Sequence, residues 1–217
     1  MKLHPDSRLL FIGDSITACG RKFPMGVGAF NQALGDGYVN LIDAALTAAY
    51  PDYGITTINM GISGNTVRDL NARWETDVLD IKPDWLVIKI GINDVWGYFS
   101  QTPPPVYHIS VDEYAQTLDQ LIQQTRSSLR GLILMTPYYL EPNRQELMRA
   151  RMDQFGAVVR DMASRHQALL VDTQAAFDSV LPCIHPLSLA IDRIHPNLTG
   201  HMILARAFLQ RINYSWE

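Results

Sequence analysis

RLLFIGDSI, residues 8–16, is the stretch that decides the fold of this chain. Four apolar residues in a row, Leu9 to Ile12, followed by a glycine, are typical of a short strand buried on both faces. Asp14 and Ser15 come directly after this run, so we expect the serine to lie on the turn that follows the strand. In open α/β folds the active crevice lies at the carboxyl edge of the sheet. The stretch therefore predicts a serine at the functional edge of a parallel sheet.

The rest of the chain alternates between strand-like runs and helical patterns. Further apolar or β-branched runs lie at 55–60, 85–90, 132–135 and 168–172. Apolar residues at helical spacing lie at 38–50, 66–80, 110–122, 144–166 and from 199 onward, and we expect long loops at 20–37 and 96–108. Strands that alternate with helices indicate βαβ units. The pattern predicts an α/β fold, a three-layer α/β/α sandwich with a parallel sheet of about five strands, in a single domain over residues 1–217.

Composition narrows the class of protein. The 217 residues suit one domain with a sizeable core, and 47% hydrophobic with 18% charged residues are typical of a globular protein. A net charge of -4 without a dense Lys/Arg run argues against nucleic acid as a partner. We find neither a signal-peptide core nor the roughly 20 apolar residues of a membrane span, so we expect a cytoplasmic protein without membrane contact. Its two cysteines, Cys19 and Cys183, do not imply a disulfide framework.

A nucleophilic serine needs a general base and a group that orients the base. Asp192 and His195 supply both, because two intervening residues allow the side chains to project from one turn. Asp192 would accept from one ring nitrogen of His195, and the other nitrogen would take the proton of Ser15. Both residues follow the last predicted strand, so they can reach the sheet edge that carries the serine. We therefore interpret the three as a Ser-His-Asp triad.

Two rivals to this triad are weaker. His185 lies in an Ile-His-Pro triplet identical to that of His195. At the place where His195 has Asp192, however, His185 has Pro182, so it lacks a nearby carboxylate. Cys19 is a second candidate nucleophile, but a small packed residue is the favoured interpretation.

The developing oxyanion also needs fixed donors, each of which lowers the barrier by about 3 kcal/mol. Three groups follow predicted strands: the backbone N–H of Ser15, the backbone N–H of Gly64 and the side-chain amide of Asn93. Gly64 alone could be an ordinary turn glycine, and Asn93 alone could be a turn cap. Their common place at the sheet edge favours an oxyanion hole.

Other residues at this edge leave alternatives open. Asp14, Asp94, Asp192 and His195 could together form a metal site. We favour the interpretation that Asp14 braces the loop of Ser15 and Asp94 the turn of Asn93, and we expect no metal or cofactor. Four aromatic residues could stack on sugar rings or pack within their loops: Trp96, Tyr98, Tyr138 and Tyr139. Aromatic residues near the end of the chain leave a homo-oligomer open: Tyr214 and Trp216.

Four blocks of sequence together resemble the SGNH (GDSL-type) hydrolases. They are GDSI at 13–16, GISGNT at 61–66, GIND at 91–94 and DRIHP at 192–196. The resemblance implies the flavodoxin-like fold of that family and no cofactor. It also implies that Ser15, Asp192 and His195 form the triad and that Ser15, Gly64 and Asn93 form the oxyanion hole.

Longer segments resemble the bacterial intracellular acetylxylan esterases of this family. They are GDSITACGR at 13–21, GISGNTVRDL at 61–70, GINDVW at 91–96, ILMTP at 133–137, VDTQAAF at 171–177 and GHMILARAF at 200–208. This resemblance implies a serine esterase that removes O-acetyl groups from xylo-oligosaccharides through an acyl-enzyme, with a small acetylated carbohydrate as its partner. Two alternatives remain: an esterase, lipase or thioesterase acting on lipid or other acyl esters, and a non-catalytic carbohydrate-binding protein.

Overall fold

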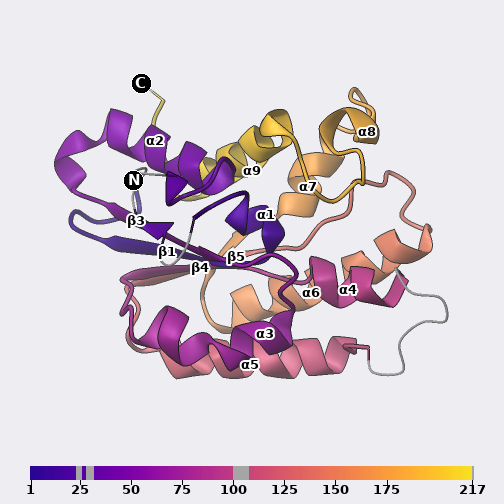
Figure 1. Ribbon diagram of the computed structural model, residues 1–217, viewed down its shortest axis with the longest axis horizontal. Coiled ribbons are helices and arrows are strands. Elements are labelled where there is room, and N and C mark those ends of the chain that lie inside the picture. The colour runs from indigo at the N-terminus through magenta and orange to yellow at the C-terminus, as the bar shows by residue number, and fades with distance from the viewer. Residues whose placement is uncertain (23–25, 28–31, 100–107, 217) are drawn as a thin grey trace.

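A computed structural model describes residues 1–22, 26–27, 32–99 and 108–216 of the protein. Within these residues, a single sheet has the strand order β2-β3-β1-β4-β5-β6. All strand pairs among β1, β3, β4, β5 and β6 are parallel. Helices lie above and below this sheet (Figure 1). The predicted three-layer sandwich with a parallel sheet of about five strands is thus confirmed.

Continuous burial explains why the sequence pattern locates the strands so well. The parallel strands are β1 (Arg8–Gly13), β3 (Thr56–Gly61), β4 (Trp85–Lys89), β5 (Gly131–Met135) and β6 (Leu169–Val171). Every residue of β4 and β5 is buried, and in β1 and β3 only the first residue is exposed. A strand covered on both faces favours an unbroken apolar run, and each of these parallel strands overlaps the run that predicted it.

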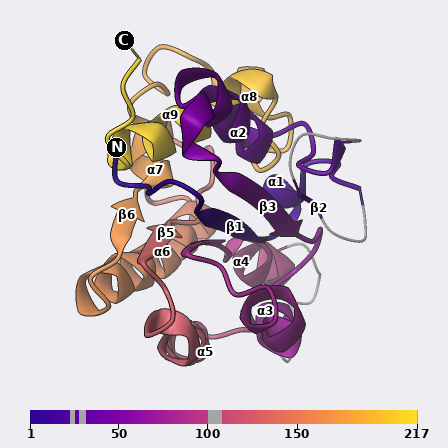
Figure 2. The same ribbon diagram turned by 90° about the vertical axis from the view of Figure 1, so that its left-hand side faces the viewer.

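Helices cover both faces of the sheet. One face carries α2 (Tyr38–Ala49), α7 (Thr173–Asp178) and α9 (Leu198–Arg211), and the other carries α3 (Val67–Ala72), α5 (Val111–Arg126) and α6 (Leu147–Arg165) (Figures 1 and 2). Further elements are α1 (Ser15–Ala18), α4 (Ile92–Phe99), α8 (Pro186–Leu189) and the 3-10 turn Pro51–Tyr53. In the described ranges, no helix combines the length and apolar character that crossing a membrane requires.

Two segments expected to be loops contain regular structure. Strand β2 (Gly26–Val27) lies inside the expected loop 20–37 and pairs antiparallel with β3. Helix α4 takes up the start of the expected loop 96–108, whose residues 100–107 lie outside the described residues. Ile92 and Val95 are buried one turn apart, and this apolar face fixes α4 against the core despite Gly97.

The helix expected over 66–80 is interrupted. Helix α3 ends at Ala72, Arg73 forms its C-cap, and a π-helical turn follows over Glu75–Leu79. Its N-terminus agrees with the sequence, because the Thr66 side chain caps it in a capping box with Asp69. The interruption at Arg73 directs that side chain toward the ends of the strands, as described below.

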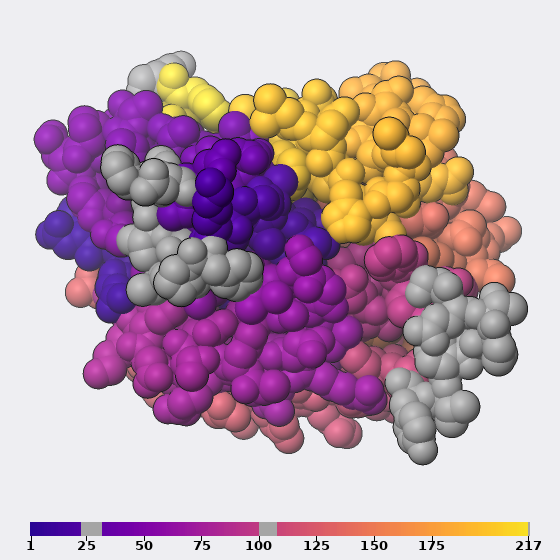
Figure 3. Space-filling view, in the orientation of Figure 1, coloured from indigo at the N-terminus to yellow at the C-terminus, as the bar shows by residue number. Residues whose placement is uncertain are grey.

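Two strand-end glycines set how closely the first helix approaches the sheet. A Cβ on Gly13 would lie 2.3 Å from the carbonyl oxygen of Lys89, and a Cβ on Gly61 would lie 2.3 Å from the backbone nitrogen of Ala18. Both neighbours are backbone atoms, which cannot rotate away as a side chain can. Helix α1 therefore packs on the end of β3 at a distance that only glycine permits. N-terminal (indigo) and C-terminal (yellow) segments meet on one face of the molecule (Figure 3).

We expect Gly61→Ala to lower the free energy of unfolding by about 1–3 kcal/mol, because the added methyl group overlaps the backbone of α1. Gly97→Ala is the matched control. It adds the same group inside a helix where no described atom lies within 4 Å, so a gain of up to about 1 kcal/mol is expected. Urea unfolding measures both changes, and equal stability of the two variants would contradict the packing argument.

Candidate active site

Ser15 begins helix α1 directly after strand β1. The N-cap of this helix is Asp14, whose buried Oδ1 accepts a hydrogen bond from the backbone N–H of Ile16 at 3.0 Å. The carboxylate therefore braces the turn that carries the serine, as the sequence suggested. Ser15 itself is half-buried, and its Oγ lies 2.8 Å from Nε2 of His195. The serine hydroxyl is thus already paired with a ring nitrogen.

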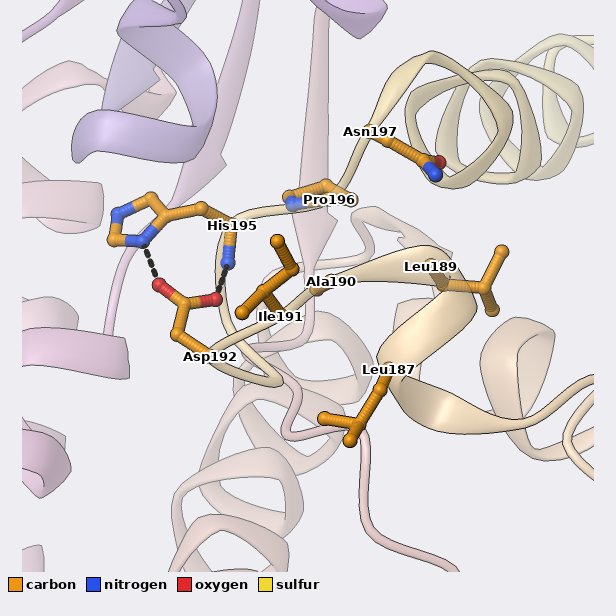
Figure 4. A pocket seen from close by; sticks show the side chains of 8 residues that line it. All are labelled: Leu187, Leu189, Ala190, Ile191, Asp192, His195, Pro196 and Asn197. Atoms are coloured by element: carbon orange, nitrogen blue, oxygen red, sulfur yellow. Dashed lines mark hydrogen bonds and ion pairs between the residues drawn. The ribbon is translucent and has the colours of Figure 1, made fainter.

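Asp192 holds the ring of His195 from the other side. Its Oδ2 lies 2.6 Å from Nδ1 of the ring, and its Oδ1 accepts from the backbone N–H of His195 at 2.8 Å (Figure 4). The same Oδ1 also accepts from the backbone N–H of Ile194 at 2.9 Å. Partial burial opposes ionisation of this carboxyl, but the hydrogen bond from the ring and the two backbone bonds together lower the pKa of Asp192. Because an ionised carboxylate only accepts, Nδ1 carries the ring proton and a neutral ring leaves Nε2 free to accept from Ser15.

The loop that carries this pair is fixed by strand-end residues of β5. The hydroxyl of buried Tyr138 donates to the carbonyl of Ile194 at 2.9 Å, and the backbone N–H of Leu140 donates to the carbonyl of Arg193 at 3.0 Å. Arg193 adopts a φ of 62°, and its guanidinium pairs with Glu141 at 2.5 Å. These contacts anchor the segment between Asp192 and His195 to the core and hold His195 beside Ser15.

A pocket of about 530 Å³ adjoins the Asp192–His195 pair. Its lining residues are Leu187, Leu189, Ala190, Ile191, Asp192, His195, Pro196 and Asn197 (Figure 4). Most of these side chains are apolar, and Ile191 is 91% exposed. The pocket gives the reacting groups an open, largely apolar border on the histidine side.

The remaining predicted site residues follow neighbouring strands. Gly64 lies in the turn after β3 with a φ of 83°, and it is exposed. Asn93 lies in the first turn of α4 after β4, and its Nδ2 donates to the carbonyl of Asn65 at 2.9 Å. A side-chain amide has two N–H groups, so this bond leaves a second donor for another acceptor. Since β3 and β4 both pair with β1, the structure brings these groups to the strand end that carries Ser15.

Asp94 differs from its expected role. Its Oδ1 accepts from the backbone N–H of Val67 at 2.9 Å, so it braces the start of α3 in addition to lying beside Asn93. Burial raises the pKa of Asp94 to about 7. Asp14 likewise bonds a backbone N–H, and within the described residues no cluster of three or more His, Cys, Asp or Glu side chains could hold a metal ion.

The aromatic residues separate into two groups. Tyr138 is fully buried, so the alternative of sugar stacking is wrong for it. Tyr139 is half-buried, whereas Trp96 and Tyr98 expose 41% and 36% of their surface on helix α4. These two positions keep an aromatic face available to a ligand.

The rival histidine, His185, caps helix α8 by accepting from the backbone N–H of Leu187.

His201 is a site neighbour that no pattern in the sequence selects. It is buried on α9, its Nδ1 accepts from the backbone N–H of Tyr38 at 3.2 Å, and its Nε2 lies 3.2 Å from the Cys19 sulfur. Burial raises the pKa of Cys19, with a further increase from Asp36. The thiol is therefore a packed hydrogen-bond partner rather than an activated nucleophile. Only the fold joins these residues, since 182 positions separate the cysteine from the histidine.

Comparisons with known proteins agree with this arrangement. The model of the GDSL-like lipase/acylhydrolase family matches residues 11–203. The acetylxylan esterase of Geobacillus stearothermophilus is 53% identical over 216 residues, which span 100% of this chain and 98% of that protein. Its crystal structure matches with a TM-score of 0.95 over the same shares of the two chains.

Two further findings extend this likeness. Structures described as catalytic mutants of the same esterase carry alanine in place of a serine, a histidine or an aspartate. An alpha/beta hydrolase enzyme from the metagenome of Lake Arreo, Spain, is 48% identical, with a TM-score of 0.95 over 98% of each chain.

The buried state of His201 predicts a pH effect on stability. Burial, with repulsion from Lys89 and His195, lowers the pKa of His201 to about 4, whereas an unfolded histidine titrates near 6.5. Between these values the unfolded chain binds a proton that the folded chain does not, so this residue's contribution to stability falls as pH drops from about 6.5 to about 4, by at most about 3 kcal/mol.

Urea unfolding of wild type and His201→Gln at several pH values measures this effect. Asp94 acts with the opposite sign in the same pH range, because its raised pKa makes the folded chain bind the extra proton. The difference between the two proteins removes that shared contribution. We expect wild type to lose more stability on acidification than the variant, and parallel curves would contradict the assignment.

Proposed function

Because this chain belongs to the GDSL-like lipase/acylhydrolase family, we propose that it is a serine esterase that removes O-acetyl groups from xylo-oligosaccharides. The observation that supports the chemistry is the hydrogen-bonded line from Ser15 through His195 to Asp192. The substrate follows from the likeness to the Geobacillus acetylxylan esterase, which extends over the full chain. We assign Ser15, His195 and Asp192 as the catalytic triad.

Acylation begins when Nε2 of His195 takes the proton of Ser15 and Oγ attacks the acetyl carbonyl carbon. The carbonyl oxygen becomes an oxyanion, for which we assign the N–H groups of Ser15 and Gly64 and the amide of Asn93 as donors. When the intermediate collapses, the bond to the sugar oxygen breaks and His195 returns its proton to that oxygen. The products are the sugar alcohol and an acetyl ester of Ser15.

Deacylation repeats these steps with water as the nucleophile. His195 takes a proton from water, the hydroxide adds to the acetyl carbonyl, and the second intermediate expels Ser15 Oγ, which regains the proton. Acetate leaves. Asp192 carries the charge that stabilises the imidazolium in both steps and keeps the ring in the tautomer that presents Nε2 to the serine.

We also propose that residues 1–217 form one domain. The parallel strands between residues 8 and 171 belong to one sheet, and helices α2 and α9 pack together although they lie far apart in sequence. A cytoplasmic location and a homo-oligomer stay predictions from the sequence.

Ser15→Ala should lower acetate release from acetylated xylo-oligosaccharides by about four orders of magnitude or more, because the acyl-enzyme cannot form. Release is measured on wild type and variant with circular dichroism as the check of folding. A folded variant at the wild-type rate would remove Ser15 as the nucleophile. Release by neither protein would contradict the substrate, and a comparison of acetyl with octanoyl esters would then test the lipid alternative.

His195→Ala should cause a loss of similar size, because Ser15 then has no base. The other Ile-His-Pro triplet, which contains His185, supplies a matched control. His185→Ala removes an exposed histidine that caps a short helix, so we expect activity within a few-fold of wild type. Equal losses in the two variants would refute the choice of His195.

Asn93→Ala should lower kcat about a hundredfold or more, with a much smaller change in KM, because the donor acts mainly on the transition state. Asn71→Ala, on the exposed side of helix α3, is the control and should retain wild-type kcat. An unchanged kcat in Asn93→Ala would exclude the amide from the oxyanion hole.

A further inference from the structure

We propose that Arg73 is a positioning residue of the oxyanion hole, because its single guanidinium binds the chain segments that carry the donors. The inference rests on the proposed function, since it assigns a role within the same site. Arg73 touches none of the reacting atoms in this assignment. It acts through the backbone and side-chain groups that it holds.

The guanidinium of Arg73 is largely buried, with 13% of the side chain exposed. Nη2 donates to the carbonyl of Gly13 at 3.1 Å, and Nη1 donates to the carbonyl of Met60 at 2.8 Å. Nε donates to Oδ1 of Asn65 at 2.7 Å. The charge is balanced by Asp77, whose carboxylate lies 2.5 Å from Nη1. One side chain thus joins the ends of β1 and β3 and the turn that follows β3.

Two of these contacts, those to Gly13 and Asn65, lead to the proposed donors. Gly13 lies two residues before Ser15, so its carbonyl fixes the end of the strand that carries the nucleophile. Asn65 directly follows Gly64, so the bond to its side chain holds the turn that aims the Gly64 N–H. The carbonyl of Asn65 in turn accepts from Nδ2 of Asn93 at 2.9 Å. Arg73 is therefore connected, through Gly13 and Asn65, to the segments that carry all three assigned donors.

Only arginine suits this place. A guanidinium is a planar fork with five N–H donors, which can address several acceptors in fixed directions. A lysine ammonium is a compact charge that could pair with Asp77 but could not reach the same three acceptors together. Oxyanion donors stabilise charge only if they are oriented in advance, so loss of the fork should leave substrate binding intact and slow the chemical step.

The first test is Arg73→Lys, assayed with p-nitrophenyl acetate. We expect kcat to fall about tenfold to a hundredfold with KM within about twofold of wild type, as for a small misplacement of catalytic groups. Arg68→Lys is the matched control, because Arg68 lies on helix α3, which Arg73 caps, but is 48% exposed and pairs with Glu113. It should retain wild-type kcat. Wild-type kcat in a folded Arg73→Lys variant would overturn the proposal.

A double-mutant cycle separates positioning from a merely structural role. If Arg73 acts through the hole, the loss of kcat in Arg73→Lys combined with Asn93→Ala should be smaller than the product of the two single losses, because one of the donors that Arg73 positions is already missing. A combined loss equal to that product would overturn the proposal. The pH dependence of kcat/KM should be the same in wild type and Arg73→Lys, because Arg73 does not contact the Ser15–His195–Asp192 line; an altered profile would contradict positioning of the hole alone.

Asn65→Ala is the second variant if Arg73→Lys does not fold. It removes one acceptor of the guanidinium and keeps the backbone carbonyl that Asn93 binds, so we expect a smaller loss of kcat, with KM unchanged; no loss would overturn the proposal. Use of p-nitrophenyl acetate also separates the test of Arg73 from the test of the proposed substrate. If the wild-type protein hydrolyses this ester but does not deacetylate xylo-oligosaccharides, the proposed substrate is refuted and the comparison of Arg73→Lys with wild type stays valid.

Discussion

The contact between helix α1 and the end of strand β3 is the constraint on which the rest of the structure depends. Glycine at 61 lets the backbones of β3 and α1 touch, and the buried side chain of Asn59 then binds the carbonyls of Thr17 and Leu34 at 2.8 Å. This packing sets the place of Ser15 relative to the neighbouring strand ends. A bulkier junction would move the serine away from the groups at the ends of β3 and β4.

Polar side chains at this edge mostly bind backbone groups rather than one another. Asp14 and Asp94 accept from N–H groups, whereas Arg21 and Arg73 donate to carbonyls at the ends of strands. A charged group that is buried must be compensated by hydrogen bonds or by an opposite charge. Here the compensation also fixes the turns in place. The same bonds that permit burial therefore make the edge rigid, and a rigid edge is what oriented donors require.

The sequence predicted the parallel strands and the residues that meet at their ends, because those features are local. Buried strands leave unbroken apolar runs, and the short blocks that contain Ser15, Gly64 and Asn93 lie directly after β1, β3 and β4. Residues whose roles depend on contacts with distant parts of the chain have no such local sequence signal. His201 and Arg73 have no neighbours in sequence that suggest their contacts, and the burial of Tyr138 became visible only in the fold.

The arrangement of the triad has a consequence for synthesis of the chain. Asp192 and His195 form one local unit, so the only long-range distance in the line is that from Ser15 to His195, across 180 positions. The segment that carries Ser15 is synthesised early and the segment that carries His195 late. All of the parallel strands have therefore been synthesised before His195, so the Ser15–His195 contact can form only after the residues of the sheet are present.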